Sequence, residues 1–309
     1  MFKYTLDNKR YHTLNYYFKN KYGKKTFKVS LNANFSCPNK INGPGCIFCS
    51  RLGSGDFAGN KDKGLLTQFN DIKEIMEKKW PNSYYIGYFQ ANTNTFAPVP
   101  ILKEKYEQIL SIPNVVGLNI ATRSDAISKE CYEYLSDLNK RTNLIVELGL
   151  QSIHAKTLKF INRGHDLENF EQAVKELQKR NIEVVVHIIN GLPNETEEDM
   201  LETVKYLNKL KIDGIKIHML HIIKDTDLAD YYKEHPFHIL TKEEYIDIVI
   251  KQLELLNPQI VIHRITGDPK KEDLIAPNWL LKKFCVLNDI DKEMVRRNTY
   301  QGKKIKDNS

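Results

Sequence analysis

The 309-residue sequence predicts an α/β fold, a partial (β/α)6-type, TIM-like barrel of parallel strands with short N-terminal and C-terminal helical extensions. Two observations support this prediction. Apolar runs rich in valine and isoleucine recur along the chain, and a segment of helical periodicity precedes each run after the first. Such runs are typical of parallel strands that are buried on both faces and joined by crossover helices. In barrels of this kind, reactive side chains lie at the carboxyl ends of the strands and in the loops that follow.

The elements alternate regularly along the chain. The predicted strands are residues 26–33, 84–89, 115–121, 144–150, 182–189, 214–220 and 259–263. The predicted helices between them are residues 66–79, 99–110, 128–139, 167–180, 196–210 and 241–256. A short helix is expected near the N-terminus, a last helical segment over 279–297, and disorder over 302–309. The predicted division is an extension over 1–25, a barrel over 26–265, and a C-terminal helical extension with a basic tail over 266–309.

The composition is that of a globular protein with a core, because 41% of the residues are hydrophobic and 28% are charged. No run of about 18 apolar residues occurs, and residues 1–10 lack an apolar signal core, so we expect a cytoplasmic protein without membrane contact. The net charge is +7, and lysines gather near both ends. A net positive charge favours binding of polyanions such as RNA, although a solvated lysine-rich surface gives the same net charge.

Three of the five cysteines, Cys37, Cys46 and Cys49, fall in one loop directly after the first predicted strand. In a reducing compartment, such a cluster indicates metal binding rather than disulfides. A structural zinc site needs four ligands, and the fourth would have to be remote, such as Cys131, Cys285 or a histidine. Three thiolates instead leave one coordination position open, which favours a 4Fe-4S cluster whose fourth iron binds a small molecule. For Cys131 and Cys285 the simpler interpretation is a small buried apolar side chain.

The cysteine loop, residues 37–49, resembles the cluster loop of the radical S-adenosylmethionine (SAM) enzymes, with a wider gap between Cys37 and Cys46 than is common there. Further segments are similar to the YhcC/YtqA-type subfamily and to the radical half of the elongator catalytic subunit. These segments are residues 27–39, 89–98, 121–125, 147–152, 162–165, 191–196, 266–268 and 276–279. The resemblance implies two cofactors, a 4Fe-4S cluster held by Cys37, Cys46 and Cys49, and SAM.

The resemblance also implies a SAM-binding set drawn from successive strand ends. Its members are Phe48, Gln90, Asn92, Thr93, Arg123, Glu147, Gln151, Arg163, Gly191, Leu192 and Pro193. In this assignment Phe48 packs near adenine, Glu147 and Gln151 suit the ribose hydroxyls, and Arg163 suits the cofactor carboxylate. The segment from Gln90 meets the methionine amino group, and 191–193 offers its backbone to adenine. Taken singly, these are ordinary surface, capping or turn residues.

Other polar residues are candidates to line a substrate pocket, but the sequence does not decide between this role and a structural one. Lys216 and His218 share one face of the sixth predicted strand, and with His187 they are candidates to line that pocket. The alternative is that each histidine is buried and bonded to the backbone, and His263 is equally undecided. No catalytic acid or base is identified. The glycine-rich segment 53–59 lacks the Lys-Ser/Thr ending of a phosphate loop and is expected to be a flexible extension of the cysteine loop.

The function that the resemblance implies is cleavage of SAM to a 5′-deoxyadenosyl radical, which takes hydrogen from a C–H bond. The implied substrate is transfer RNA (tRNA), in which carboxymethylaminomethyluridine at the wobble position becomes aminomethyluridine. The implied partners are tRNA, an electron donor such as flavodoxin or ferredoxin, and a SAM-dependent methyltransferase that acts on the product. Two alternatives stay open: a radical SAM enzyme acting on a small metabolite or protein, and a non-catalytic, zinc-stabilised RNA-binding protein.

Overall fold

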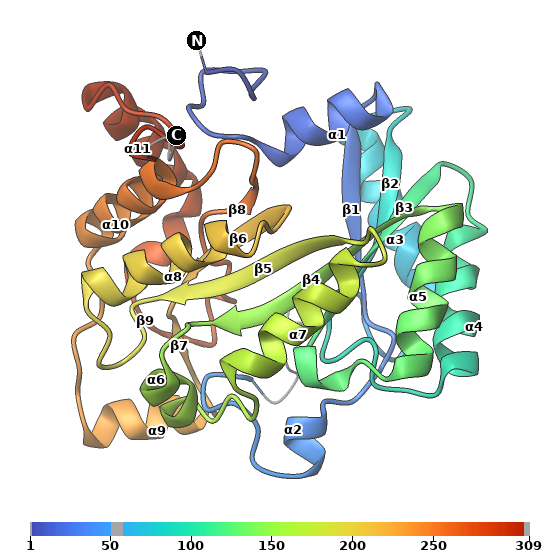
Figure 1. Ribbon diagram of the computed structural model, residues 1–309, viewed down its shortest axis with the longest axis horizontal. Coiled ribbons are helices and arrows are strands. Elements are labelled where there is room, and N and C mark those ends of the chain that lie inside the picture. The colour runs from blue at the N-terminus through green and yellow to red at the C-terminus, as the bar shows by residue number, and fades with distance from the viewer. Residues whose placement is uncertain (1, 51–57, 306–309) are drawn as a thin grey trace. The chain divides into compact units, whose positions relative to one another are not determined.

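The computed structural model describes residues 2–50 and 58–305, and its main sheet has seven strands (Figure 1). In sheet order these are β1 (Thr26–Leu31), β2 (Tyr84–Phe89), β3 (Val115–Thr122), β4 (Asn143–Gln151), β5 (Glu183–Asn190), β6 (Gly214–Met219) and β8 (Val261–Arg264). The pairs β1–β2, β2–β3, β3–β4 and β6–β8 are parallel. A second, antiparallel sheet pairs β7 (Ile222–Ile223) with β9 (Leu274–Ala276). All seven strands predicted from the sequence are confirmed.

Six helices precede the strands of the main sheet, as predicted. They are α3 (Leu65–Lys79), α4 (Val99–Leu110), α5 (Lys129–Arg141), α7 (Leu167–Gln178), α8 (Glu197–Lys209) and α10 (Lys242–Leu255). The predicted terminal helices are α1 (Leu14–Tyr22) and α11 (Lys283–Arg296). The sequence did not reveal α2 (Pro38–Ile41), α6 (Ala155–Phe160), α9 (Asp227–Glu234) or the 3-10 turn Ser124–Ala126, whereas the 3-10 turn Asn278–Lys282 begins the helical segment predicted over 279–297. The elements that were not revealed are too short for a helical pattern of apolar residues to repeat often enough to be recognised in the sequence.

The chain forms two compact units. Unit 1 comprises Met1–Tyr17, Leu150–Arg163 and Val186–Ser309, and unit 2 comprises Phe18–Gly149 and Gly164–Val185. Strands β4 and β5 each have residues in both units. The predicted division into a barrel with two extensions stays a prediction.

Unit 2 contains β1 to β3 in register, with α4 packed against them. Gly87 on β2 makes this packing close, since a Cβ there would lie 2.4 Å from Ile109 and 2.8 Å from Leu118. The buried rings of Phe89 and Tyr106, whose centroids lie 4.8 Å apart, belong to the same core. Parallel register places the carboxyl ends of β1, β2 and β3 at one edge, and the cysteine loop follows β1 there.

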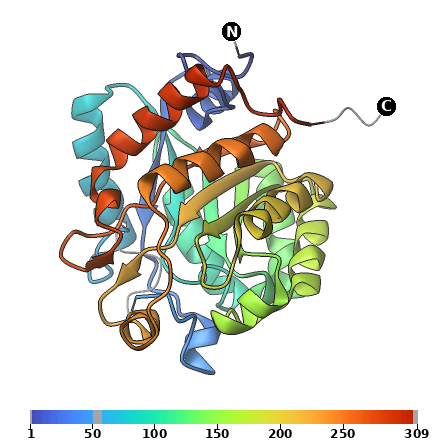
Figure 2. The ribbon, with the colours of Figure 1, turned by 90° about the vertical axis from the view of Figure 1, so that its left-hand side faces the viewer.

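Unit 1 is held together by buried polar bonds between helices and strands. The side chains of Asn190, at the end of β5, and Gln252 on α10 exchange two hydrogen bonds of 2.8 Å. Figure 2 shows α10 (orange) and α11 (red) running side by side in this unit. Residues from 302 were expected to be disordered, but the Gly302 N–H donates to the Leu253 carbonyl at 3.0 Å. Backbone bonds to the end of α10 therefore correct that expectation for the described part of the tail.

Candidate functional site

The three predicted cluster ligands lie in a loop of unit 2 that is folded by its own backbone bonds. Cys37 caps α2, and its carbonyl accepts from the N–H groups of residues 40 and 41 at 3.0 and 3.1 Å. The Cys49 N–H donates to the Cys46 carbonyl at 3.0 Å. Cys46 is buried, whereas Cys37 and Cys49 are half-buried, and none of the three forms a disulfide within the described residues. The Lys40 ammonium donates to the Ser50 carbonyl at 2.6 Å and so ties the end of the loop to α2.

Arg123, in the loop after β3, supplies positive charge beside these thiols. Its guanidinium makes two bonds to Asp125, at 2.8 and 2.7 Å. Burial lowers the pKa of Arg123, but Asp125 and the nearby Cys46 and Cys37 outweigh burial, so the pKa lies above its ordinary value. Arg123 is 5% exposed, and its Nη1 has no hydrogen-bond partner among the described residues. An unsatisfied buried donor on a cation beside thiols fits an anionic group bound by those thiols.

Asn39 and Gly164 complete the surroundings of Cys46. The Asn39 amide donates to the Cys46 Sγ at 3.5 Å. Gly164 has a φ of +81°, and a Cβ there would lie 2.4 Å from Asn39 Oδ1 and 3.1 Å from Arg123 Nη2. Only a glycine allows this close approach in this backbone conformation. The sequence analysis did not identify Asn39, although its place two residues after Cys37 was a usable signal.

The segment that follows β2 lies beside the cysteine loop. The Thr93 N–H donates to the Ser36 carbonyl at 3.3 Å, and the Gln90 N–H donates to the Leu31 carbonyl at 3.2 Å. Asn94, which is fully buried, fixes the segment by donating to the Phe89 and Ala121 carbonyls at 3.0 and 2.8 Å. The structure thus brings the predicted Gln90–Thr93 segment beside the residue that precedes Cys37. Asn92 and Phe48 are half-buried in the same unit.

Glu147 on β4 has two side-chain partners that were not predicted from the sequence. Its Oε1 accepts from Lys28 Nζ on β1 and from Asn119 Nδ2 on β3, both at 2.8 Å. Lys28 also lies over the Tyr88 ring, 5.1 Å from its centroid. The Oδ1 of Asn119 has no partner within residues 2–50 and 58–305, so it can accept from a hydroxyl group of a ligand. A lysine inside a strand predicted to be buried on both faces was the available signal for this ion pair.

The remaining predicted SAM-binding residues lie in unit 1. Gln151, the last residue of β4, has a φ of +73°, and Arg163, after α6, is 4% exposed. Gly191, after β5, also has a positive φ, of +81°, and its N–H donates to Met200 Sδ at 3.2 Å. Leu192 and Pro193 follow it and are buried.

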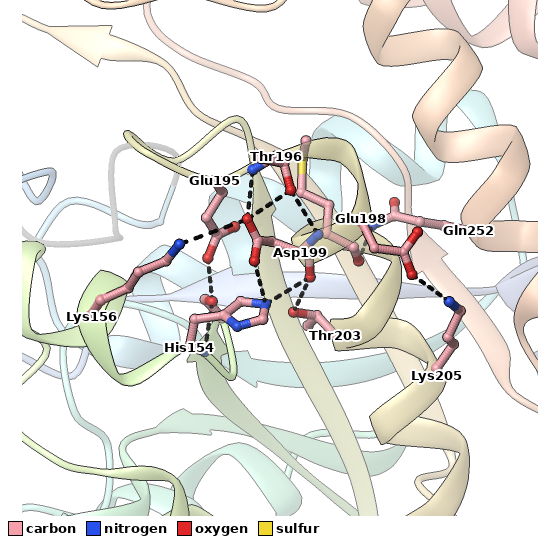
Figure 3. A network of polar contacts seen from close by, with 11 residues as sticks. His154, Lys156, Glu195, Thr196, Glu198, Asp199, Thr203, Lys205 and Gln252 are labelled. Atoms are coloured by element: carbon pink, nitrogen blue, oxygen red, sulfur yellow. Dashed lines mark hydrogen bonds and ion pairs between the residues drawn. The ribbon is translucent and has the colours of Figure 1, made fainter.

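A polar network joins the loop after β4 to the loop after β5 (Figure 3). The Ser152 hydroxyl donates to Glu195, and burial raises the pKa of that carboxyl group although the hydrogen bonds lower it. His154 Nε2 lies 3.0 Å from the Asp199 carbonyl oxygen. Thr196 is the N-cap of α8, and the Asp199 carboxylate completes the capping box by accepting from the Thr196 N–H at 2.7 Å. The same carboxylate lies 3.9 Å from the Lys156 ammonium. The network therefore ties the two loops to each other.

The predicted pocket residues of unit 1 come together. The rings of His187 and His218 have centroids 5.6 Å apart, and Lys216 pairs in register with Arg264 on β8. Burial lowers the pKa of His218 well below its ordinary value, and Arg264, His187, Lys216 and His221 lower it further. Arg264 and His221 were not predicted from the sequence.

The two cysteines outside the loop differ in burial. Cys131 is buried as expected, and burial raises the pKa of its thiol to about 12. Cys285 is exposed, which corrects the expectation that it is buried.

Family models match most of the chain. The radical SAM superfamily model matches residues 35–207, and the radical SAM C-terminal domain model matches residues 212–296. The chain belongs to the radical SAM superfamily. Enzymes of this superfamily use a 4Fe-4S cluster and SAM, so these are the cofactors of the chain, and the thiol loop beside Arg123 fits the cluster. No helix within the described residues is long and apolar enough to cross a membrane.

Among radical SAM relatives, YtqA of Bacillus subtilis is 47% identical over 305 residues, which is 98% of this chain and 95% of that protein. YhcC of Escherichia coli K12 is 31% identical over 276 residues, or 88% of each chain. Elongator complex protein 3 of Saccharomyces cerevisiae is 27% identical over 161 residues, which is 51% of this chain and 28% of that protein. The solved structure of Elp3 from Methanocaldococcus infernus has a TM-score of 0.67 at 18% identity and covers 89% of this chain and 64% of that one. The predicted radical SAM partial barrel is thereby confirmed.

Proposed function

We propose that this radical SAM enzyme modifies the wobble uridine of tRNA and converts carboxymethylaminomethyluridine to aminomethyluridine. The observation that carries the radical part is the three-thiol loop beside Arg123. The substrate part is supported by the resemblance to the YhcC/YtqA-type subfamily, which extends over 98% of the chain in the comparison with YtqA. The net charge of +7 also favours a polyanion.

In this proposal Cys37, Cys46 and Cys49 hold the cluster, and the surrounding residues bind SAM and orient it. When bound, the cluster and SAM would supply the radical chemistry that removes a hydrogen atom from the CH2 of the carboxymethyl group. With SAM as the two-electron oxidant, ending as methionine and 5′-deoxyadenosine, and with water as co-reactant, the C–N bond would break and the carboxymethyl group would leave as glyoxylate, with the amine kept on the uridine. Arg123 offsets the negative charge of the thiolates, and its free Nη1 donates to an anionic group. Asn119 Oδ1 accepts from a ligand hydroxyl group, while Glu147 is held in place by Lys28.

Unit 1 supplies backbone and positioning groups. The segment 191–193 presents its backbone to adenine, and the Ser152–Glu195 bond keeps the two adjoining loops together. The proposed partners are tRNA, an electron donor such as flavodoxin or ferredoxin, and a SAM-dependent methyltransferase that takes over the aminomethyl product. Arg163 and Gln151 remain proposed contacts to the carboxylate and ribose of SAM.

The test is the nucleoside composition of tRNA from a strain that lacks the gene. We expect carboxymethylaminomethyluridine to accumulate and aminomethyluridine, with its methylated derivative, to disappear. Complementation with the wild-type gene should restore the profile, whereas the Cys46→Ala gene should not. An unchanged profile in the deletion strain would refute the wobble-uridine substrate and favour a small metabolite or protein.

A further inference from the structure

A group of cationic and imidazole side chains gathers within unit 1, on β5, β6 and β8 and in the loop after β6. We call it the cationic cluster, and its members are His187, Lys216, His218, His221 and Arg264. Lys216 and His218 lie two residues apart on β6 and therefore face the same side of the sheet. The cluster belongs to the strand regions that carry substrate contacts in barrels of this type.

The geometry brings the members of the cluster close to His218. The ring of His187 lies 5.6 Å from that of His218, with an angle of 36° between the planes. Arg264 is the register partner of Lys216 on the neighbouring strand. The His221 Nδ1 lies 3.3 Å from the Met219 carbonyl oxygen, so the loop after β6 turns back beside the end of that strand.

The electrostatic effect of the cluster is to keep His218 neutral. Burial is the first cause of its lowered pKa, and the four named neighbours act in the same direction. Each of these unit 1 neighbours is a cation or an imidazole that becomes one on protonation. Lys216 is buried, the three histidines are half-buried and Arg264 is exposed, so the cluster borders solvent. Positive charge at such a partly buried place stabilises an anion more strongly than the same charges would in water. The arrangement therefore suits a ligand carboxylate, with a neutral imidazole available as a hydrogen-bond donor.

We propose that the cationic cluster binds the carboxylate of the carboxymethylamino group on the substrate uridine. This inference rests on the proposed function, which places one carboxylate on the reacting side chain. Arg264 and Lys216 pair with the carboxylate, and His218 donates to it from its neutral ring. The product carries an aminomethyl group, which is cationic and has no carboxylate. The same cluster therefore attracts the substrate and repels the product, which gives both specificity and product release.

Binding of RNA to the full-length, cluster-reconstituted enzyme tests the inference. Three anticodon stem-loop RNAs would carry carboxymethylaminomethyluridine, its methyl ester, which lacks the carboxylate, or aminomethyluridine at the wobble position. We expect the wild-type enzyme to bind the carboxylate RNA about tenfold more tightly than the ester, as for one hydrogen bond to a charged group. Arg264→Gln and His218→Gln should each reduce this ratio towards one and leave the affinity for the ester unchanged.

The control is Lys271→Gln, which removes an exposed lysine from the loop after β8 and should behave as the wild type. If Arg264→Gln weakens all three RNAs equally, the cluster contacts backbone phosphate, and the inference is wrong. A ratio that persists in both variants places the carboxylate elsewhere. Loss of SAM binding in Arg264→Gln would assign the carboxylate of SAM to the cluster and would likewise overturn the inference.

The two proposals fail in different ways. The wobble-uridine function fails if tRNA from the deletion strain is unchanged and the wild-type enzyme forms no aminomethyluridine from the carboxylate RNA. The inference alone fails if the wild-type enzyme forms this product while Arg264→Gln keeps the full preference for carboxylate RNA over ester RNA.

Discussion

The side-chain amide of Asn39 donates a hydrogen bond to the Sγ of Cys46, and Gly164 leaves the space that this bond requires. We predict that Gly164→Ala destabilises the protein and lowers its iron content. A non-glycine residue at positive φ costs about 1–2 kcal/mol, and here the new Cβ also lies 2.4 Å from Asn39 Oδ1. Urea unfolding and iron per chain after anaerobic reconstitution measure the two effects.

Gly23→Ala is the matched control for Gly164→Ala. Gly23 has a φ of +73°, but a Cβ there meets nothing within 4 Å. This variant should lose about 1–2 kcal/mol from backbone strain alone and keep its full iron content. Equal iron content in the two variants would show that Asn39 does not support the cluster.

Replacement of a cluster thiol separates the metal-binding cysteines from the other two. We predict that Cys37→Ala, Cys46→Ala and Cys49→Ala each lose the brown charge-transfer absorption and most of the bound iron and sulfide. Three thiolates bind three of the four irons and leave one iron open, so each thiolate is needed to hold the cluster. The comparison is with Cys285→Ala, because Cys285 is exposed. Full iron loading in Cys37→Ala, or loss of iron in Cys285→Ala, would contradict the assignment.

We predict that the buried ion pair between Lys28 and Glu147 contributes to the free energy of unfolding. The Lys28 side chain is 14% exposed and that of Glu147 is 0% exposed, with 2.8 Å between them. Removing one partner takes away the cation that offsets a buried carboxylate, so Lys28→Met should lower the free energy of unfolding by about 3–5 kcal/mol. The double variant Lys28→Met/Glu147→Gln should recover much of that loss, because no charge is left buried. Denaturant unfolding of the cluster-free protein measures both.

A surface pair serves as the comparison for Lys28. Lys63 and Asp71 lie 2.6 Å apart, but each side chain is about half exposed, at 50% and 49%. Lys63→Met should therefore cost no more than about 1 kcal/mol. If Lys28→Met costs no more than Lys63→Met, Glu147 is not held by this ion pair.

The main sheet and the cysteine loop could be predicted because their signals are local in sequence. Each strand is an apolar run, and Cys37, Cys46 and Cys49 lie within one loop. The partners of the polar residues could not be predicted in this way, since Lys28 and Glu147 are 119 positions apart and meet only through strand order and register. A single polar residue in an apolar strand signals that a partner exists without saying which residue it is.

The pairing of Lys216 with Arg264 could not be predicted from the sequence either. It depends on a register irregularity between β6 and β8 that no sequence pattern marks. The short helices α6 and α9, of 6 and 8 residues, are set by tertiary packing rather than by periodicity. The described end of the chain is ordered by backbone bonds to α10, which composition alone does not reveal.

The raised pKa of Glu195 predicts how stability depends on pH. Burial favours the protonated carboxyl group in the folded state, so the folded protein binds more protons than the unfolded protein above pH 4.5, the ordinary value for Glu. The contribution of Glu195 to stability is therefore greatest below pH 4.5 and is lost as the pH rises from there through the raised folded pKa. Glu195→Gln removes this dependence.

Urea midpoints of the wild type and of Glu195→Gln between pH 4 and about 8 isolate this contribution, because other titrating groups are shared. We expect the stability of the wild type relative to Glu195→Gln to fall as the pH rises through that window and then to level off. Glu198→Gln on α8 makes the same carboxyl-to-amide change at an exposed position and controls for the substitution itself. A rise with pH in the Glu195 comparison would mean that the hydrogen bond from Ser152, rather than burial, has the larger effect on the pKa of this carboxyl group.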